Sequence, residues 1–492
     1  MMSRNKGVQQ SLFTTTLDEV VPSDHFLRKL DAMVDFSFIY EELAPYYCID
    51  NGRPSTDPVV IVKSLLIAFI YGINSERRLE QELRYNVAYR WFLGLGFDET
   101  IPDHSTISQL RRRKFDDADL FKKLFAHVVR LCAENGLISG KLLITDSTHV
   151  KANATKMSKI TVQIEKDTAE FFELLDAYET EERKHLEMPE RSSKLPESAI
   201  SSKLPESAIS SKLPESAISS KRPGPTISRK RPGPKITTQT KSITDPDAGW
   251  LNRPDKPEGF HYLSHQTLDA QSGIIIAVEA TPGNTSDNTP YLAQIDDAMQ
   301  TLKEFDIEAQ TVSADSAYDT AIIHKGLKER NLIPYMPKKK ISDNSKTEYK
   351  REDFTYNQEN DEFVCPHGQI LSLRCIQRNE TGLFREYRAN PKLCRNCTHR
   401  DRCLAPSQRN RGRKIQVNIF QGIVDEHHMA DGGPEHIHAL KMRQIWCEGT
   451  FATQKSRHNM SRLNRRGLRS AKDHCLLSAT AVNLKRMVKC MG

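Results

Sequence analysis

Three acidic side chains are the residues of this chain best placed for chemistry. Asp146 ends one apolar run, Asp315 ends a second, and Glu448 lies in a stretch with helical spacing. Hard divalent cations prefer oxygen ligands, and a pair of such ions can hold the attacking and leaving oxygens of an in-line displacement. Carboxylates from two strand ends and one helix therefore predict a site for phosphoryl transfer with two Mg²⁺ ions.

Each carboxylate also has a structural interpretation. An aspartate at the end of a strand often caps the turn that follows it, because its side-chain oxygens accept hydrogen bonds from nearby backbone N–H groups. One such residue alone would therefore carry little information. Three of them, in this order and in a basic chain, favour the chemical interpretation.

A second set of candidate ligands is a group of cysteines between the last two acids. The C-x-x-C spacing of Cys394 and Cys397 lets two thiolates reach one tetrahedral ion. The preferred set for a structural zinc ion is Cys365, Cys394, Cys397 and Cys403. Cys375 or His367 could substitute, and free thiols on a β-rich insertion are the alternative. All-thiolate sites usually close the coordination sphere, which argues against a zinc-dependent hydrolase.

Histidines near the last acid form a further group. His427 and His428 are adjacent, and His436 and His438 follow closely. They could mimic a metal cluster, but the intervening Gly-Gly-Pro sequence favours loop histidines.

The balance of charge is compatible with a nucleic-acid partner. The chain has 492 residues and a formal net charge of +7, which many soluble proteins share. The distribution of charge is more informative than the total. Basic residues gather in four clusters, at 111–114, 338–340, 409–414 and 462–469.

Nothing in the sequence predicts a signal peptide or a membrane span. Residues 1–16 are polar, and the most apolar run, Pro58–Ile70, is short for a bilayer and contains Lys63. We expect this run to form a buried helix that Asp57 and Pro58 begin, and we expect a cytoplasmic protein. In a reducing compartment the ten cysteines are unlikely to be a disulfide framework.

The elements that must position these residues change along the chain. Helical spacing runs from the N-terminus to about residue 135. Strand signals begin after Gly136, with a short strand over 142–145 that ends at Asp146, and a charged helix is expected over 161–186. A hairpin is predicted from 261–269 and 274–281, followed by a helix over 290–305 and the strand before Asp315.

A nonapeptide repeat interrupts this pattern. The sequence Ser-Ser-Lys-Leu-Pro-Glu-Ser-Ala-Ile at 192–200 recurs at 201–209 and 210–218, and degenerate copies follow to 236. Proline breaks both helices and strand ladders, so we expect a disordered linker. The alternative is a flexible basic arm that tracks DNA.

Three motifs give the chain a family resemblance. They are Asp-Ser-Thr-His-Val-Lys-Ala-Asn from Asp146, Ala-Asp-Ser-Ala-Tyr-Asp around Asp315, and Glu-Gly-Thr-Phe from Glu448 with Lys455 seven residues later. In this order the motifs resemble those of the DDE transposases of bacterial insertion sequences. There is one departure. Related enzymes often carry Tyr-x-x-Arg-x-x-x-Glu, but the corresponding positions here hold Lys441 and Gln444, and Arg443 is one place off.

The resemblance implies a mixed α+β fold. We expect an InsH-like helical N-terminal domain and an RNase H-like α/β catalytic core, interrupted by the repeat linker and by a β-rich insertion that could bind zinc. The expected divisions are 1–135 for DNA-end binding, 136–190 and 241–335 for the core, 191–240 for the linker, 336–430 for the insertion and 431–492 for a helical part that carries Glu448.

The resemblance also implies a function. The chain would be a transposase that binds the terminal inverted repeats of its insertion sequence and catalyses metal-dependent DNA cleavage and strand transfer. Asp146, Asp315 and Glu448 would hold two Mg²⁺ or Mn²⁺ ions. The residues expected to bind DNA are Arg111, Arg112, Arg113, Arg443, Lys455, Arg462, Arg465 and Arg466. His149 and Tyr318 would position DNA or serve only in packing.

The expected partner is double-stranded DNA, both at the transposon ends and as the target. The resemblance also implies a homodimer in the synaptic complex and a location associated with the nucleoid. Two alternatives stay open. One is a structure-specific nuclease that cleaves DNA without strand transfer. The other is a catalytically inactive protein that still binds DNA ends.

Overall fold

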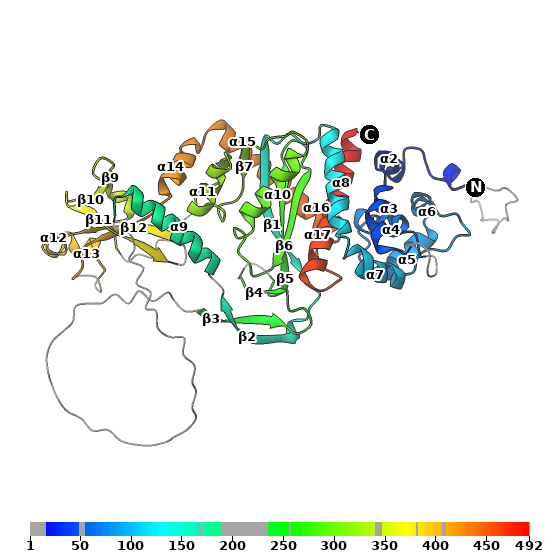
Figure 1. Ribbon diagram of the computed structural model, residues 1–492, viewed down its shortest axis with the longest axis horizontal. Coiled ribbons are helices and arrows are strands. Elements are labelled where there is room, and N and C mark those ends of the chain that lie inside the picture. Colours follow the sequence, from blue (N-terminus) through cyan, green and yellow to red (C-terminus); the bar gives the residue numbers. More distant parts are fainter. Residues whose placement is uncertain are drawn as a thin grey trace, which may run out of the picture. The chain divides into compact units, whose positions relative to one another are not determined.

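The computed structural model describes residues 16–48, 55–166, 169–188, 235–254, 257–339, 347–379, 382–405 and 410–491. The predicted disordered linker lies outside the described residues, except for its last six positions, where strand β3 (Lys235–Ser242) begins. The chain divides into two compact units (Figure 1). Unit 1 holds residues 1–162, 240–345 and 420–492, and unit 2 holds 163–239 and 346–419. The finer division expected from the sequence stays a prediction.

Unit 1 begins with helices. They are α1 (Leu17–Val20), α2 (Phe26–Met33), α3 (Phe38–Leu43), α4 (Pro58–Ile70), α5 (Glu76–Tyr85), α6 (Val87–Leu93), α7 (His104–Leu110) and α8 (Leu120–Glu134). Asp57 caps α4 by accepting a hydrogen bond from the Val59 N–H, and Pro58 is its first residue. Most of α4 is buried, which confirms the expected buried helix. Within the described ranges, no helix combines the length and the apolar character that a bilayer crossing requires.

A mixed sheet forms the centre of unit 1. Its strands are β4 (Gly249–Leu251), β5 (Gly259–Asp269), β1 (Leu142–Lys151), β7 (Thr311–Ser313) and β8 (Ile333–Tyr335), in that order, and β6 (Ile275–Pro282) also pairs with β5. Strand β5 is antiparallel to β1, β4 and β6, which confirms the predicted hairpin. Strands β1, β7 and β8 are parallel to one another.

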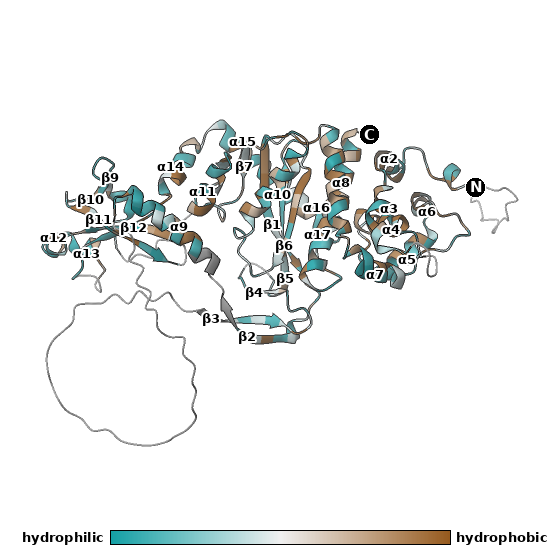
Figure 2. Ribbon diagram, in the orientation of Figure 1, coloured by the Kyte–Doolittle hydropathy of each residue, from teal (hydrophilic) through white to brown (hydrophobic). Residues whose placement is uncertain are grey.

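The sheet is covered on both faces. Every residue of β5 is buried, and apolar residues run along β1 and β6 (Figure 2). Helices α10 (Tyr291–Lys303) and α17 (Leu468–Met491) both pack against β5 and β6. Asn483 of α17 fastens that helix to the sheet, because its amide accepts from the Ile275 N–H and donates to the Ile275 carbonyl at 2.8 Å each.

Two expectations about this region are wrong. Strand β1 does not end at Asp146 but continues to Lys151, because the residues after Asp146 pair with β5 from His265 to His261. The charged helix does not begin near Thr161. Strand β2 (Lys159–Lys166) pairs with β3 there, and the helix α9 occupies Ala169–His185.

Unit 2 has a sheet of its own. Five antiparallel strands lie in the order β13 (Lys414–Asn418), β12 (Gly382–Ala389), β11 (Ile370–Asn379), β10 (Glu362–Val364) and β9 (Thr355–Asn357). Acidic residues of α9 pair with arginines of this sheet, as Glu179 does with Arg378 at 3.1 Å. The helices α12 (Pro391–Arg395) and α13 (Arg400–Cys403) carry cysteines.

Candidate functional site

The register of two parallel strands aligns the first two predicted acids. Strand β1 pairs with β7 so that Leu142 lies opposite Thr311 and Ile144 opposite Ser313. Asp315 follows the last paired residue of β7 by two positions, as Asp146 follows Ile144 in β1. The negative charge of Asp315 raises the pKa of Asp146, so the two carboxylates lie near each other. The fold therefore brings together two carboxylates that are 169 positions apart in the sequence, 315 − 146.

The environment of Asp146 disfavours its charge. The pKa of this carboxyl is raised to about 6, chiefly by burial. The Ser147 N–H, which donates to Oδ1 at 2.7 Å, and the guanidinium of Arg443 lower the pKa, whereas the negative charges of Asp315 and Asp287 raise it. Asp146 thus changes its protonation state close to neutral pH, and an additional cation beside it would favour the carboxylate.

Arg443 is the basic partner of Asp146. It is the last residue of α15 (Pro434–Arg443), and its Nη1 donates to Asp146 Oδ2 at 3.1 Å. Both side chains are about one-fifth exposed. The sequence predicted a phosphate contact for Arg443, and in this conformation the guanidinium instead pairs with a proposed metal ligand.

Glu448 lies at the end of a π-helical segment, η7 (Gln444–Glu448), that follows α15. Its side chain is exposed, whereas Cys447 beside it is buried. The pKa of Cys447 is raised first by burial, then by Asp146, and least by Glu448, so this thiol lies near both acids. Short π-helical segments within α-helices occur frequently at functional sites.

The ligand oxygens of the three predicted acids do not all lie within 4.8 Å of one another. Among the residues that the structure describes, the group of three whose ligand atoms lie within 4.8 Å of one another is Asp319, His324 and His428. Asp146 and Asp315 are brought together by the sheet, and Glu448 is carried on a separate element that contacts β1.

Sequence reasoning missed Asp287. This residue follows β6 in a loop, and its Oδ1 accepts a hydrogen bond from Ser147 Oγ at 2.8 Å. Its charge raises the pKa of Asp146, so it is a third acid near the aligned pair. An aspartate shortly after a core strand was the signal that could have identified it.

Tyr318 lies near the same acids. It is 1% exposed and its ring packs against Tyr291 at a centroid distance of 4.8 Å. Its pKa is raised, first by burial and then by Asp146, Asp287 and Asp315. The burial corrects the expectation that Tyr318 positions DNA and supports the packing alternative.

The predicted DNA-binding arginines fall into two groups. Arg111 is buried and pairs with Glu76 at 3.2 Å, and Arg465 pairs with Asp116 at 2.9 Å, so both hold segments of unit 1 together. For Arg111 the expected DNA contact is wrong in this conformation, because the guanidinium faces the protein interior. The exposed members of the set are Arg112, Arg113, Lys455, Arg462 and Arg466.

The predicted zinc ligands share one cavity in unit 2. Cys365, Cys394, Cys397 and Cys403 line it together with His367 and His399, whereas Cys375 does not. The pKa of Cys403 is raised to about 11, chiefly by burial; Arg413 lowers it, and the other three thiols contribute smaller increases. The Gln369 N–H donates to Cys365 Sγ at 3.3 Å. The four cysteines thus line one cavity. Among the described residues, their sulfurs are not a group of three or more that all lie within 4.8 Å of one another.

Two family models match the sequence. Residues 15–113 match a transposase domain (DUF772), and residues 364–488 match a transposase DDE domain. No curated protein matches the chain. The solved structure of a piggyBac transposase synaptic complex with hairpin DNA is 7% identical, with 94% of this chain and 76% of that chain covered and a TM-score of 0.33. A likeness of that size carries no argument, so the two domain models are the informative matches.

Proposed function

We propose that this chain, which belongs to the DDE transposases of insertion-sequence type, cleaves DNA at the ends of its element and joins them to a target. The observation that carries the proposal is the register of β1 and β7, which aligns Asp146 with Asp315 beside the guanidinium of Arg443. We expect the enzyme to act on double-stranded DNA in the cytoplasm, with two copies at paired ends.

The strand order supports an RNase H-like core. Along the sheet the order β6-β5-β1-β7-β8 consists of three antiparallel strands followed by two strands parallel to β1. Helix α10 connects the two groups in the chain, which gives the expected sequence of three strands, a helix and a further strand before an acid.

The residues present fit a divalent cation. Asp146 is about one-fifth exposed, has a pKa raised to about 6 and lies near the charges of Asp315 and Asp287. Oxygen ligands of this kind suit Mg²⁺ or Mn²⁺. We assign the binding of two ions to Asp146, Asp315 and Glu448. When bound, such ions would activate water or a 3′-hydroxyl as the nucleophile and stabilise the leaving oxygen.

The protein groups around this site have separable roles. Asp146 lies within β1, and Asp315 follows the last residue of β7 by two positions, so both acids are held close to the central sheet. Arg443 pairs with Asp146 in this structure, and its guanidinium would be available to a DNA phosphate if a bound cation satisfied that carboxylate. The exposed cations Lys455, Arg462 and Arg466 would add phosphate affinity that declines steeply with salt.

The test is a DNA assay with the full chain and a plasmid that carries the terminal repeats of its own element. Mg²⁺ and Mn²⁺ are compared with EDTA, and wild type with Asp146→Asn and Glu448→Gln. The matched controls are Asp297→Asn and Glu304→Gln, which change exposed acids of unit 1 outside the site. Nicking at the ends and joined products that require metal, and that both site variants lose, are the expected result.

Two other outcomes would replace the proposal. Cleavage at the ends without joined products, under every condition, would favour the nuclease. Binding of the ends without cleavage in any metal, unchanged by Asp146→Asn, would favour an inactive end-binding protein.

A further inference from the structure

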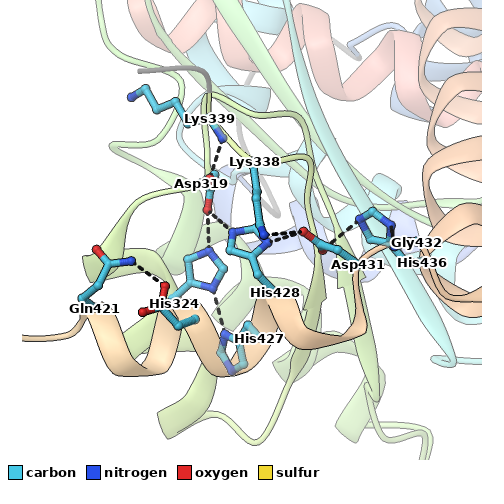
Figure 3. A network of polar contacts seen from close by, with 11 residues as sticks. Asp319, His324, Lys338, Lys339, Gln421, His427, His428, Asp431, Gly432 and His436 are labelled. Carbon is cyan, nitrogen blue, oxygen red and sulfur yellow. Dashed lines mark hydrogen bonds and ion pairs between the residues drawn. The ribbon is translucent and has the colours of Figure 1, made fainter. Parts of the chain in front are cut away.

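A buried group of two imidazoles and a carboxylate lies apart from the acidic pair. Asp319 Oδ1 is 2.8 Å from His324 Nε2 and 3.0 Å from His428 Nε2. The three side chains are at most 8% exposed. Figure 3 shows both imidazole rings directed at the Asp319 carboxylate. One nitrogen from each ring thus lies against the same carboxylate oxygen, and the three atoms are within 4.8 Å of one another.

Three segments of unit 1 supply this group. Asp319 ends the turn that begins at Asp315, and His324 is in the first turns of α11 (Ala321–Glu329). His428 follows α14 (Gln421–His427) and begins a short 3-10 helix. The sequence favoured loop histidines at 427 and 428, and the structure instead places them at the end of a helix, close to residues that are about a hundred positions earlier.

Every outward-facing polar atom of the group has a partner. His428 Nδ1 is 2.9 Å from Asp431 Oδ2, and His324 Nδ1 is 2.8 Å from the Nδ1 of His427. The other oxygen of Asp319, Oδ2, accepts from the Lys339 N–H at 2.7 Å. Histidines that bind metals almost always donate their second ring N–H to a carboxylate, a carbonyl or water, which fixes the ring. His428 follows this pattern through Asp431, whereas the outer partner of His324 is the imidazole of His427. The contact of His428 is thus a second observation, separate from the inner atoms, that favours a metal ligand set.

We propose that Asp319, His324 and His428 bind one Zn²⁺-class transition-metal ion. Two imidazole nitrogens and a carboxylate oxygen suit zinc, with a fourth position for water, whereas Mg²⁺ prefers oxygen ligands alone. Ligand atoms about 2.0–2.2 Å from a tetrahedral ion lie about 3.4 Å from one another. The observed separations of 2.8 and 3.0 Å therefore need to open by only about half an ångström.

The ion would act on the geometry of the protein and not on the reacting phosphate. A bound ion would fasten Asp319 to the segment that begins after residue 419. The turn that follows Asp315 would be held with it. Unit 2 contributes residues 346–419 between these two points of the sequence. This inference does not depend on the proposed function.

The test measures metal binding by the full chain with Zn²⁺ and with Co²⁺ as a spectroscopic probe. The background carries Asp146→Asn, Cys394→Ser and Cys397→Ser, so that the acidic pair and the cysteine cavity are both weakened. Equilibrium dialysis of metal-stripped protein should show a single tight equivalent of Zn²⁺. Bound Co²⁺ should give the visible bands of a tetrahedral site with nitrogen and oxygen ligands, without a sulfur-to-cobalt charge-transfer band.

The decisive comparison uses two histidine variants in this background. His428→Gln should lose the bound equivalent, whereas the matched control His438→Gln, which changes an exposed histidine of α15, should retain it. Circular dichroism checks the fold of each, and Asp319→Asn replaces His428→Gln if that variant does not fold. Absence of tight binding in the folded background protein would overturn the proposal and leave a network of hydrogen bonds only. Equal binding by His428→Gln and the control would also overturn it.

Discussion

Replacing Arg443 by glutamine should shift the pKa of Asp146 upward in the metal-free protein. Arg443 Nη1 lies 3.1 Å from Asp146 Oδ2, and both side chains are mostly buried. An arginine at this distance lowers the pKa of an aspartate by about 1–3 units. Because the pKa of Asp146 is about 6 with Arg443 present, Arg443→Gln should raise it to about 7 or above. Each unit corresponds to about 1.4 kcal/mol between the two protonation states.

This shift has a defined effect on stability. The folded pKa of Asp146, about 6, is above its ordinary value of 3.8, so the folded protein binds the proton more tightly than the unfolded chain does. Stability from this group is therefore fully present below pH 3.8 and is lost as the pH rises to about 6. The loss in wild type amounts to about 3 kcal/mol, from 2.2 units at about 1.4 kcal/mol each. In Arg443→Gln the stability should continue to fall until the pH is at least about one unit higher than the pH at which wild type levels off.

Urea denaturation in EDTA between pH 4 and pH 9 measures this effect. Tryptophan fluorescence is a suitable signal, because Trp446 lies in η7 between Arg443 and Glu448. Wild type, Arg443→Gln, Asp146→Asn and the double variant form a cycle that isolates the pair. Arg112→Gln, which changes an exposed arginine, is the control. Asp473, whose pKa is also raised to about 6, chiefly by burial, contributes a decline that all four proteins share. If the stability of wild type and Arg443→Gln levels off at the same pH, or if Asp146→Asn retains the whole of the decline seen in wild type, the electrostatic reasoning about this pair is wrong.

Two further predictions concern other parts of unit 1. Gly273→Ala should destabilise the protein by more than about 2 kcal/mol, because Gly273 has a φ of +71° and an added Cβ would lie 2.3 Å from the Trp446 ring. Thermal denaturation compares it with Gly94→Ala, where φ is +72° but the space is open, and equal losses would contradict the steric part of this explanation. Arg112→Gln should weaken DNA binding and reduce the dependence of log affinity on log salt by about one unit. Binding titrations at several salt concentrations measure it, and an unchanged slope would remove Arg112 from the DNA interface.

The sequence by itself determined those features that depend on neighbouring residues. Asp57 and Pro58 predict the start of α4, because a capping side chain and a fixed φ act within one turn. The two β-branched runs around Gly273 predict the hairpin of β5 and β6 for a similarly local reason. The positions of Asp146 and Asp315 at the ends of apolar runs predict both as candidate ligands, and this role stays a prediction.

Only the tertiary structure decided what these residues face. The pairing of β1 with β5 carries the strand past Asp146, and Asp315, which follows the neighbouring strand β7, lies near enough for its charge to raise the pKa of Asp146. Packing buries Arg111 against Glu76, although the surrounding cluster of basic residues is typical of a DNA-binding surface. The sequence pattern alone does not distinguish a buried ion pair from a solvated charge.

The same limit explains the residues that the sequence did not connect. Asp287 approaches Asp146 through a loop, and His428 approaches Asp319 across about a hundred positions of the chain. Helical and strand periodicity report which side of an element is buried, but they contain no information about which distant element covers it. Those contacts follow from strand register and helix packing, which are set by the free energy of the whole fold and not by any one segment.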